Sequence, residues 1–472
     1  MFSQSCTSTA QCGSLQTCID SICVTKDLFP PSLLEIIGTI SVALINSLGS
    51  ASGIGGGALL VPYFILIFQR SVTQSIDYSF AVVFGGALGN YLNTAFIRDP
   101  INHGPAINYD VNLLVLPMLM IGVTFGLFLH IQLPDLATYL LLLSVLVYTL
   151  YKNTLQYKHH STREETRGHE GRGPEHLSEQ SAESSLDFED ENIEGSYPEE
   201  KEEKQELLRH HDDDSEAKFF RSESGSAKGS ERSPPSNRPQ PELKPLFPWS
   251  RFKEILLLLF AVIFFNVMRG GQSPSIVGVT MCSTSYWIIT GIMILSFVLL
   301  YIRNIYLTRS WQRDLIREKH LFRKNEIIFT KKKSYVIGGT SLVAGLYGAT
   351  VGIGGAMIIG PRLLDYHMPP KYSTFTTGFF VIFTMFGSLM GVLLQGHISI
   401  LEILWFAGFA FLCSFFMSRW VTEYMKKTGK QSLVLIFLLI ATAISMTIII
   451  TICIIQMIRN RNDMLKFHEL CV

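Results

Sequence analysis

Long apolar runs constrain this chain more than any other feature. Runs of about 15 to 25 residues recur through both halves, and about 20 helical residues cross a hydrocarbon core of roughly 30 Å. Segments such as Leu113–Leu129 and Leu433–Ile455 have almost no polar face, which a soluble protein with buried helices would need. Because lipid admits only structures that satisfy every backbone group internally, we expect an all-α polytopic membrane protein.

A glycine motif occurs twice within this apolar background. Gly53–Pro62 and Gly352–Pro361, together with Gly49 and Gly348 four residues upstream of the two copies, share six identical residues at one constant offset. This pattern indicates an internal duplication. Each glycine weakens a helix by about 1 kcal/mol, so each motif predicts a broken helix. Such backbone survives at membrane depth only where protein buries it or where it lines a wet cavity.

The apolar runs predict these spans: Leu33–Leu48, Ala58–Phe68, Asp77–Ile97, Asn112–His130, Asp135–Tyr151, Glu254–Met268, Trp287–Tyr301, Tyr335–Tyr347, Met357–Leu364, Tyr372–Leu394, Ile400–Trp420 and Ser432–Met457. The corresponding domains are a Cys-rich head (1–30), a first repeat (31–151), a linker (152–250), two connecting helices (251–303), a basic loop (304–333), a second repeat (334–458) and a tail (459–472). The linker is rich in Glu, Asp, Ser and Pro, a composition typical of disorder.

The cysteines of the head and the basic residues of one loop predict how the chain is oriented in the membrane. The head carries four candidate disulfide residues among small polar residues, namely Cys6, Cys12, Cys18 and Cys23. Three pairings are open, and zinc is a less favoured alternative because the head has no CxxC pair and no histidine. Disulfides need an oxidising compartment, so the N-terminus is expected outside the cell or in a lumen, in the plasma membrane or an endomembrane. The basic loop 303–333 is expected in the cytoplasm.

Counting the crossings gives two topologies. If each broken element counts as two segments, the first half has five crossings and starts outside, and the two halves form an inverted repeat. If each counts as one crossing, the N-terminus moves inside and the repeats are parallel. The inverted version is favoured because it agrees with the disulfide prediction.

Several motifs in both halves resemble the sulfite exporter TauE/SafE family of membrane proteins, also called the toluene-sulfonate uptake permease family, in its eukaryotic branch. Beyond the glycine motifs, they are Gly86-Ala87 with Tyr91 and Asn93, Ile107-Asn108-Tyr109-Asp110, Leu116–Gly122, Cys282–Trp287, Pro369-Pro370 and Ser373-Thr374-Phe375. The resemblance covers most of residues 33–420 outside the linker. It implies a multi-helix secondary carrier of small anions, notably sulfite and sulfonates. The chain departs from the family at Ala356, where a glycine is usual, and at Arg362, where an apolar residue is expected.

The glycine motifs also predict the chemistry of a binding site. Helix N-termini carry free N–H groups and a partial positive charge, so a glycine turn that opens into a half-helix can hold an anion. The alternative is that the glycines only allow close helix packing. A formal match of Gly53-x-Gly55-x-x-Ala58 to the dinucleotide fingerprint lacks the strand that this fingerprint requires. The candidate substrate-binding residues are Gly53, Gly55, Gly56, Gly57, Pro62, Asn90, Asn93, Gly352, Gly354, Gly355, Ala356, Pro361, Arg362 and Thr374.

Other polar residues have open roles. Asn90 and Asn93 could donate to substrate or bond between helices, and Arg362 could attract the anion or lie at an interface. For His130, His397 and Glu402 we expect interfacial placement at span ends rather than proton coupling. Ser373, Thr374, Thr376 and Thr377 could line the pathway.

The sequence leaves two function classes. The first is a carrier whose partners are a small inorganic or organic anion, the lipid bilayer and a coupling ion, either proton or sodium. The second is a non-transporting scaffold or receptor with a disulfide head and a regulatory linker. No catalytic, metal or cofactor motif is found, so an enzyme is not expected. Lys plus Arg balance Asp plus Glu at 39 each, which leaves no bulk charge to favour nucleic acid.

Overall fold

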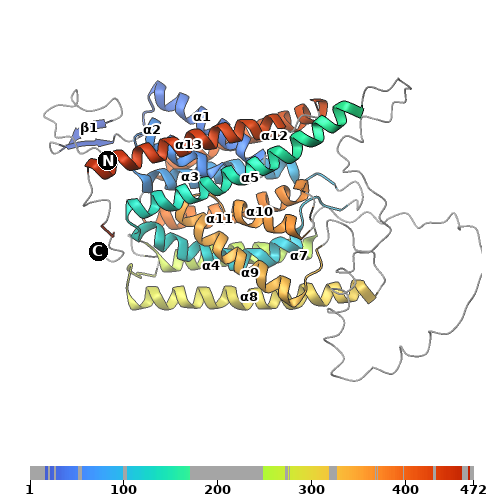
Figure 1. Ribbon diagram of the computed structural model, residues 1–472. Helices are drawn as coiled ribbons and strands as arrows, with labels where there is room; N and C mark the ends of the chain where they lie inside the picture. Colours follow the sequence, from blue (N-terminus) through green and yellow to red (C-terminus); the bar gives the residue numbers. More distant parts are fainter. Residues whose placement is uncertain are drawn as a thin grey trace, which may run out of the picture.

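The computed structural model describes residues 16–19, 22–25, 28–51, 56–98, 104–170, 248–271, 275, 277–317, 327–366, 368, 370–396, 398–428, 432–459 and 466–467. This part of the chain holds twelve helices and one antiparallel hairpin, β1 (Gln16–Ile19) and β2 (Ile22–Thr25) (Figure 1). Cys6, Cys12, Gly53, Gly55, His397 and linker residues 171–247 lie outside the described residues.

The helices follow the predicted spans. They are α1 (Leu33–Ala51), α2 (Gly57–Ile67), α3 (Val72–Thr94), α4 (Tyr109–Gln132), α5 (Asp135–Glu170), α7 (Trp249–Arg269), α8 (Thr284–Arg317), α9 (Lys331–Val351), α10 (Ala356–Asp365), α11 (Pro370–Leu394), α12 (Ile400–Thr428) and α13 (Ser432–Arg459). The transmembrane part is therefore all helical, and the hairpin of the head is an addition that the sequence analysis did not predict.

Two helices extend well beyond the predicted spans. α5 continues from the predicted end at Tyr151 to Glu170, into the predicted linker, and α8 continues from Tyr301 to Arg317. Hydropathy marks only the part of a helix that lies in lipid. The added turns are rich in Lys, Arg, Glu and Gln, which favour helix almost as well as Leu does.

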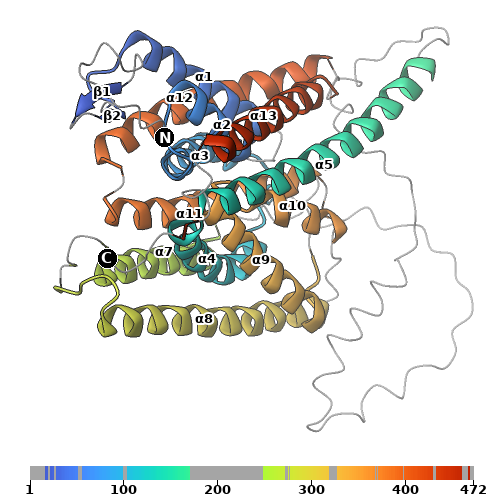
Figure 2. The ribbon, with the colours of Figure 1, turned by 60° about the vertical axis from the view of Figure 1, so that its left-hand side comes forward.

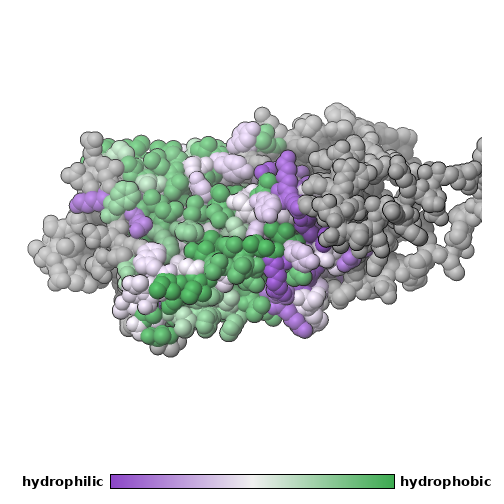
Figure 3. All heavy atoms as spheres, turned by 90° about the horizontal axis from the view of Figure 1, so that it is seen from below, coloured by the Kyte–Doolittle hydropathy of each residue, from purple (hydrophilic) through white to green (hydrophobic). Residues whose placement is uncertain are grey.

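Membrane character follows from both length and surface. In the part of the chain that the structure describes, six helices contain segments long and apolar enough to cross a membrane: Leu33–Ser50, Tyr109–Gln132, Thr284–Asp314, Lys371–Leu394, Ile400–Trp420 and Leu439–Ile458. On α8, Ile288, Leu295 and Leu299 are each more than half exposed, as lipid-facing side chains would be. Figure 3 shows hydrophobic side chains covering the visible face, with hydrophilic ones gathered toward its ends. The chain is thus an integral multi-pass membrane protein.

Helices from the two halves of the chain pack closely on one another. Along α3, Gly85 and Gly89 lie against backbone carbonyls of α12, and along α4, Gly122 and Gly126 lie against carbonyls of α9. In each pair the contacts advance in the same direction along both helices, so the two helices run parallel. Glycine permits this approach, as small residues do at helix interfaces in membranes.

α3 and α11 cross where the two halves meet. Phe84 packs on Phe386 with ring centroids 5.9 Å apart, and Tyr91 packs on Phe379 at 5.2 Å. Because a later residue of α3 meets an earlier residue of α11, these helices run antiparallel. Figure 2 shows α8 along one edge of the bundle, on the side opposite α1 and α12.

Candidate functional site

Both glycine motifs lie between two helices. α1 ends at Ala51 and α2 begins at Gly57, while α9 ends at Val351 and α10 begins at Ala356. The motif prolines, Pro62 and Pro361, stand at the same position counted from the start of α2 and of α10. Proline has no N–H and cannot complete the helix bond to the residue four positions earlier, so both short helices are weakened at one equivalent point.

Left-handed backbone at three glycines forms the second turn. Gly352, Gly354 and Gly355 have φ values of 82°, 77° and 73°. This conformation costs an L-residue roughly 1–2 kcal/mol, whereas glycine adopts it freely. The second motif therefore requires glycine at these three positions for conformational reasons.

The two turns touch each other. A methyl group placed on Gly57 would overlap the carbonyl oxygen of Gly352 and lie 2.9 Å from Cα of Ile353. The Ser79 hydroxyl of α3 lies 3.3 Å from the same Gly352 oxygen and 2.7 Å from the Ile76 carbonyl. Residues almost 300 positions apart thus meet in the interior, where the start of α2 lies against the turn between α9 and α10.

An asparagine that the sequence analysis did not single out packs against the first turn. The Asn46 side chain of α1 is fully buried between Gly56 and Gly86, and its Nδ2 donates to the Val82 carbonyl at 3.2 Å. Its Oδ1 has no hydrogen-bond partner among the described residues. An amide three residues before Gly49, inside an apolar run, is the signal that could have identified it.

Helix geometry gives this junction its chemistry. The first N–H groups of α2 and α10 have no intrahelical acceptor, and both helix starts carry partial positive charge. Such an arrangement can accept an anion. The turns are packed against each other, and neither of the two cavities described for the structure is lined by a motif residue.

The candidate side chains outside the motifs fall into different places. Asn93 donates to the Phe415 carbonyl of α12 at 2.7 Å, so its amide bonds between helices. The Asn90 amide faces Gly378 of α11. The Arg362 side chain is 41% exposed, and its guanidinium lies 3.4 Å from the carboxylate of Asp365, which is also exposed.

The threonines and serine at the start of α11 are mostly buried. Ser373 donates to the Gly360 carbonyl of α10 at 3.3 Å, and Thr376 accepts from the Asn108 N–H at 3.1 Å. Thr377 donates to the carbonyl of Thr374, whose own side chain is partly buried. This segment therefore joins α10 to α11 and to the start of α4.

His130 and Glu402 differ from the expectation of interfacial placement. His130 is 3% exposed, and its Nε2 lies 2.8 Å from Oδ1 of the fully buried Asp77. Glu402 accepts from the Tyr78 hydroxyl at 3.0 Å and lies 4.0 Å from Arg70. Both residues stand at helix ends as expected, but tertiary packing on α3 turns them inward. Asp77, first noted only as a span boundary, becomes part of a buried ionisable pair.

The cysteines add one disulfide residue that the sequence analysis did not predict. Cys282, before α8, is disulfide-bonded, while Cys413 and Cys453 are free. In the head, the backbones of Cys18 and Cys23 are directly opposite each other across the hairpin. The predicted disulfides of the head stay a prediction.

Comparison with known proteins gives relatives along most of the chain. Sulfite exporter TauE/SafE family protein 3 of Arabidopsis thaliana is 24% identical over 439 residues, which cover 92% of this chain and 82% of the relative. Family protein 2 of the same plant is 24% identical over 426 residues, 88% of this chain and 82% of the relative. Family protein 6 is 32% identical over 126 residues, 27% of this chain and 28% of the relative.

No model of a protein family matches the chain, and no solved structure does so significantly. The long alignments include the two halves that carry the glycine motifs, and the resemblance predicted from those motifs is confirmed. The chain is a multi-pass membrane protein related, over most of its length, to the sulfite exporter TauE/SafE family.

Proposed function

We propose that this protein is a secondary carrier of small anions, with sulfite, sulfonates and related sulfur compounds as its substrate class. The observation that carries the proposal is the contact of Gly57 with Gly352, which places the start of α2 against the turn that leads into α10, inside a membrane protein. The names of the relatives supply the substrate class. Partial positive charge from two helix starts favours an anion over a cation.

An inverted repeat is the architecture that we infer for this carrier. α1 and α3 run parallel to α12, and α9 and α11 run parallel to α4. Since α3 and α11 are antiparallel, α1 and α9 point in opposite directions. The pairings α1 with α12 and α9 with α4 then correspond, as expected for halves related by an axis in the membrane plane.

The N–H groups at the two helix starts are the proposed ligands of the anion. In the first turn they belong to Gly55, Gly56 and Gly57, and in the second to Gly354, Gly355 and Ala356. We assign Gly53 and Gly352 to shaping the turns, and Pro62 and Pro361 to weakening the half-helices so that they can move. Asn90 and Thr374 line the path, whereas the contacts of Asn93 and Arg362 favour helix packing and an interface role.

Two features support an N-terminus outside the cell or in a lumen. Disulfide-bonded Cys282 precedes α8, and the basic residues between positions 303 and 333 lie along and beyond the other end of the same helix. A disulfide requires an oxidising compartment, and positive loops favour the cytoplasm. Phe29, just before α1, packs on Trp405 near the start of α12, so α1 begins at the end of the bundle where α12 begins.

Flux of labelled sulfite, sulfate and taurine into proteoliposomes tests the function. The Gly354→Val variant places a branched side chain at φ 77°, with its Cβ 3.2 Å from Cγ1 of Val381, and is expected to lose flux. Gly339→Val on α9 is the matched control, because nothing lies within 4 Å of a Cβ there. If the wild type moves no anion under any imposed gradient, the scaffold or receptor alternative is preferred. If Gly354→Val transports normally, the assigned site is wrong.

For the coupling ion we propose a proton bound by Asp77 and His130. An ionisable pair buried inside a membrane protein is costly and often marks a proton path. We expect Asp77→Asn to remove the dependence of anion flux on an imposed pH gradient. Asp314→Asn, at an exposed position on α8, should keep that dependence. A full pH response in Asp77→Asn would refute proton coupling at this pair without affecting the anion assignment.

A further inference from the structure

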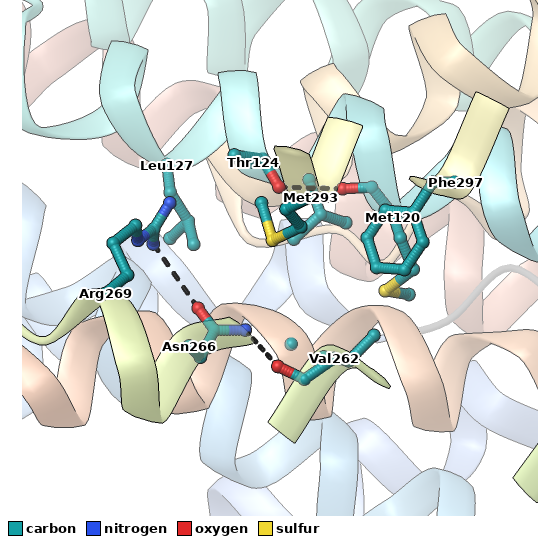
Figure 4. A pocket seen from close by; sticks show the side chains of 10 residues that line it. Met120, Thr124, Leu127, Val262, Asn266, Arg269, Met293 and Phe297 are labelled. Carbon is teal, nitrogen blue, oxygen red and sulfur yellow. Dashed lines mark hydrogen bonds between the residues drawn. The ribbon is translucent and has the colours of Figure 1, made fainter. Parts of the chain in front are cut away.

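Arg269, the last residue of α7, is buried away from the glycine junction. It is 5% exposed and lies between α7, α4 and α8, where its Nη2 donates to Oδ1 of Asn266 at 3.3 Å (Figure 4). Its guanidinium carbon lies 5.6 Å from the ring centre of Phe128 and 5.3 Å from that of Tyr286. These contacts hold the guanidinium in place but bring no negative charge.

Nothing among the described residues neutralises the charge of Arg269. Among the described residues no carboxylate pairs with it, and its Nε and Nη1 are buried without a hydrogen-bond acceptor. Arginine cannot lose its proton in a protein, so it cannot escape this cost by becoming neutral. A buried charge is stable only when it is paired and hydrogen-bonded. The missing partner must therefore carry negative charge.

A small cavity adjoins this guanidinium. It has about 10 Å³ of room for the centre of a water-sized sphere, roughly one such sphere, and Asn266 and Arg269 form its polar side. Met120, Met293 and Phe297 form its apolar wall, with Thr124 facing α7 from α4 (Figure 4). The Asn266 amide is fixed because its Nδ2 donates to the Val262 carbonyl at 2.8 Å. Asn266 therefore presents its oxygen to Arg269 and holds the guanidinium group in one orientation.

We propose that Arg269 and Asn266 form a second anion site, which binds a small monovalent inorganic anion of the size of chloride. The anion supplies the missing charge and accepts from Nε and Nη1, and the thioethers and phenyl ring suit a polarisable, weakly hydrated ion. The room beside Arg269 is small, which suits a single-atom ion, whereas an organic sulfonate is much larger. This site is separate from the glycine junction and does not depend on which anion is transported.

Thermal unfolding of the full chain in nanodiscs tests the site. Chloride is titrated against gluconate, which is too large for the cavity, at constant ionic strength. In the wild type we expect a saturable rise of the Tm by a few degrees, because a ligand that binds only the folded state stabilises it. In Arg269→Gln the rise should vanish. The Tm of this variant in gluconate should equal or exceed that of the wild type, since the uncompensated charge is gone.

Two further variants keep the proposal falsifiable. Arg269→Lys retains the charge and should keep a chloride response with affinity weakened by at least about tenfold, because it loses the planar fork. Arg303→Gln removes an exposed arginine of α8 that pairs with Glu254, and should respond like the wild type. A wild-type Tm that is independent of chloride, or an Arg269→Gln variant with the full chloride response, would overturn the proposal.

Discussion

The two glycine turns use the same residues for different physical purposes. At the start of α2, Gly56 has ordinary right-handed backbone with φ of −60°, whereas at the start of α10 Gly355 is left-handed with φ of 73°. At Gly56 glycine is needed for space, since a methyl group there would lie 2.8 Å from Cα of Asn46. At Gly355 glycine is needed for its left-handed conformation. A duplicated motif thus conserves its residue type without conserving the reason for it.

The helices that precede the turns differ as well. Three residues before Gly49 stands Asn46, and three before Gly348 stands Gly345. Asn46 inserts a polar side chain between α1 and α3, whereas Gly345 lets α9 contact the backbone of α4 at Leu119. The halves correspond in helix pairing but not in chemistry. A carrier that alternates access can use such asymmetry, because its two faces need not bind the anion equally well.

The largest effect is expected where the turns touch. Gly57→Ala would place its methyl group on the Gly352 carbonyl, which is backbone and cannot rotate away, so the junction has to open. We expect the free energy of unfolding in mixed micelles to fall by about 3 kcal/mol. Gly339→Ala, with open space around the new methyl group, should change the free energy of unfolding by no more than about 1 kcal/mol. Equal losses in both variants would mean that the turns do not depend on their contact.

An intermediate effect separates the two turns from each other. Gly355→Ala should lower the free energy of unfolding by about 1–2 kcal/mol, because alanine is strained in left-handed backbone. Gly355→Asn should lower it less, because asparagine tolerates that region. At Gly56 the order should reverse, since the larger asparagine meets the same crowding against Asn46 without any conformational benefit. The unfolding free energies of these four variants test the comparison. The same order at both positions would show that one cause governs both turns.

The smallest effect concerns the asymmetry at Asn46. Asn46→Ala removes one buried hydrogen bond, to Val82, together with an oxygen that has no partner among the described residues. The loss of unfolding free energy should therefore be about 1 kcal/mol. Flux measured beside stability shows whether the amide also serves transport. A loss well above 2 kcal/mol would indicate that the oxygen has a partner in the folded protein.

Sequence periodicity located the elements better than it located the site. All of the predicted spans correspond to helices, because membrane-length apolar runs leave little choice of structure. Helix ends were less accurate, as in α5 and α8, since hydropathy changes where lipid ends and not where a helix ends. Side chains such as Asn46, Asp77 and Arg269 gave little local signal. The importance of Asn46 and Asp77 depends on partners far away in the chain. That of Arg269 depends on the lack of a carboxylate partner among the described residues.

The sequence by itself determined that this is a helical membrane protein, where its apolar helices lie, and that helices end at the two glycine motifs. Those properties depend on local hydrophobicity and backbone freedom, which can be read residue by residue. Only the tertiary structure decided that Gly57 meets Gly352, that His130 faces Asp77, and that Arg269 is buried with no carboxylate partner among the described residues. Such contacts arise when helices from both halves pack together, so their energies belong to pairs of distant residues.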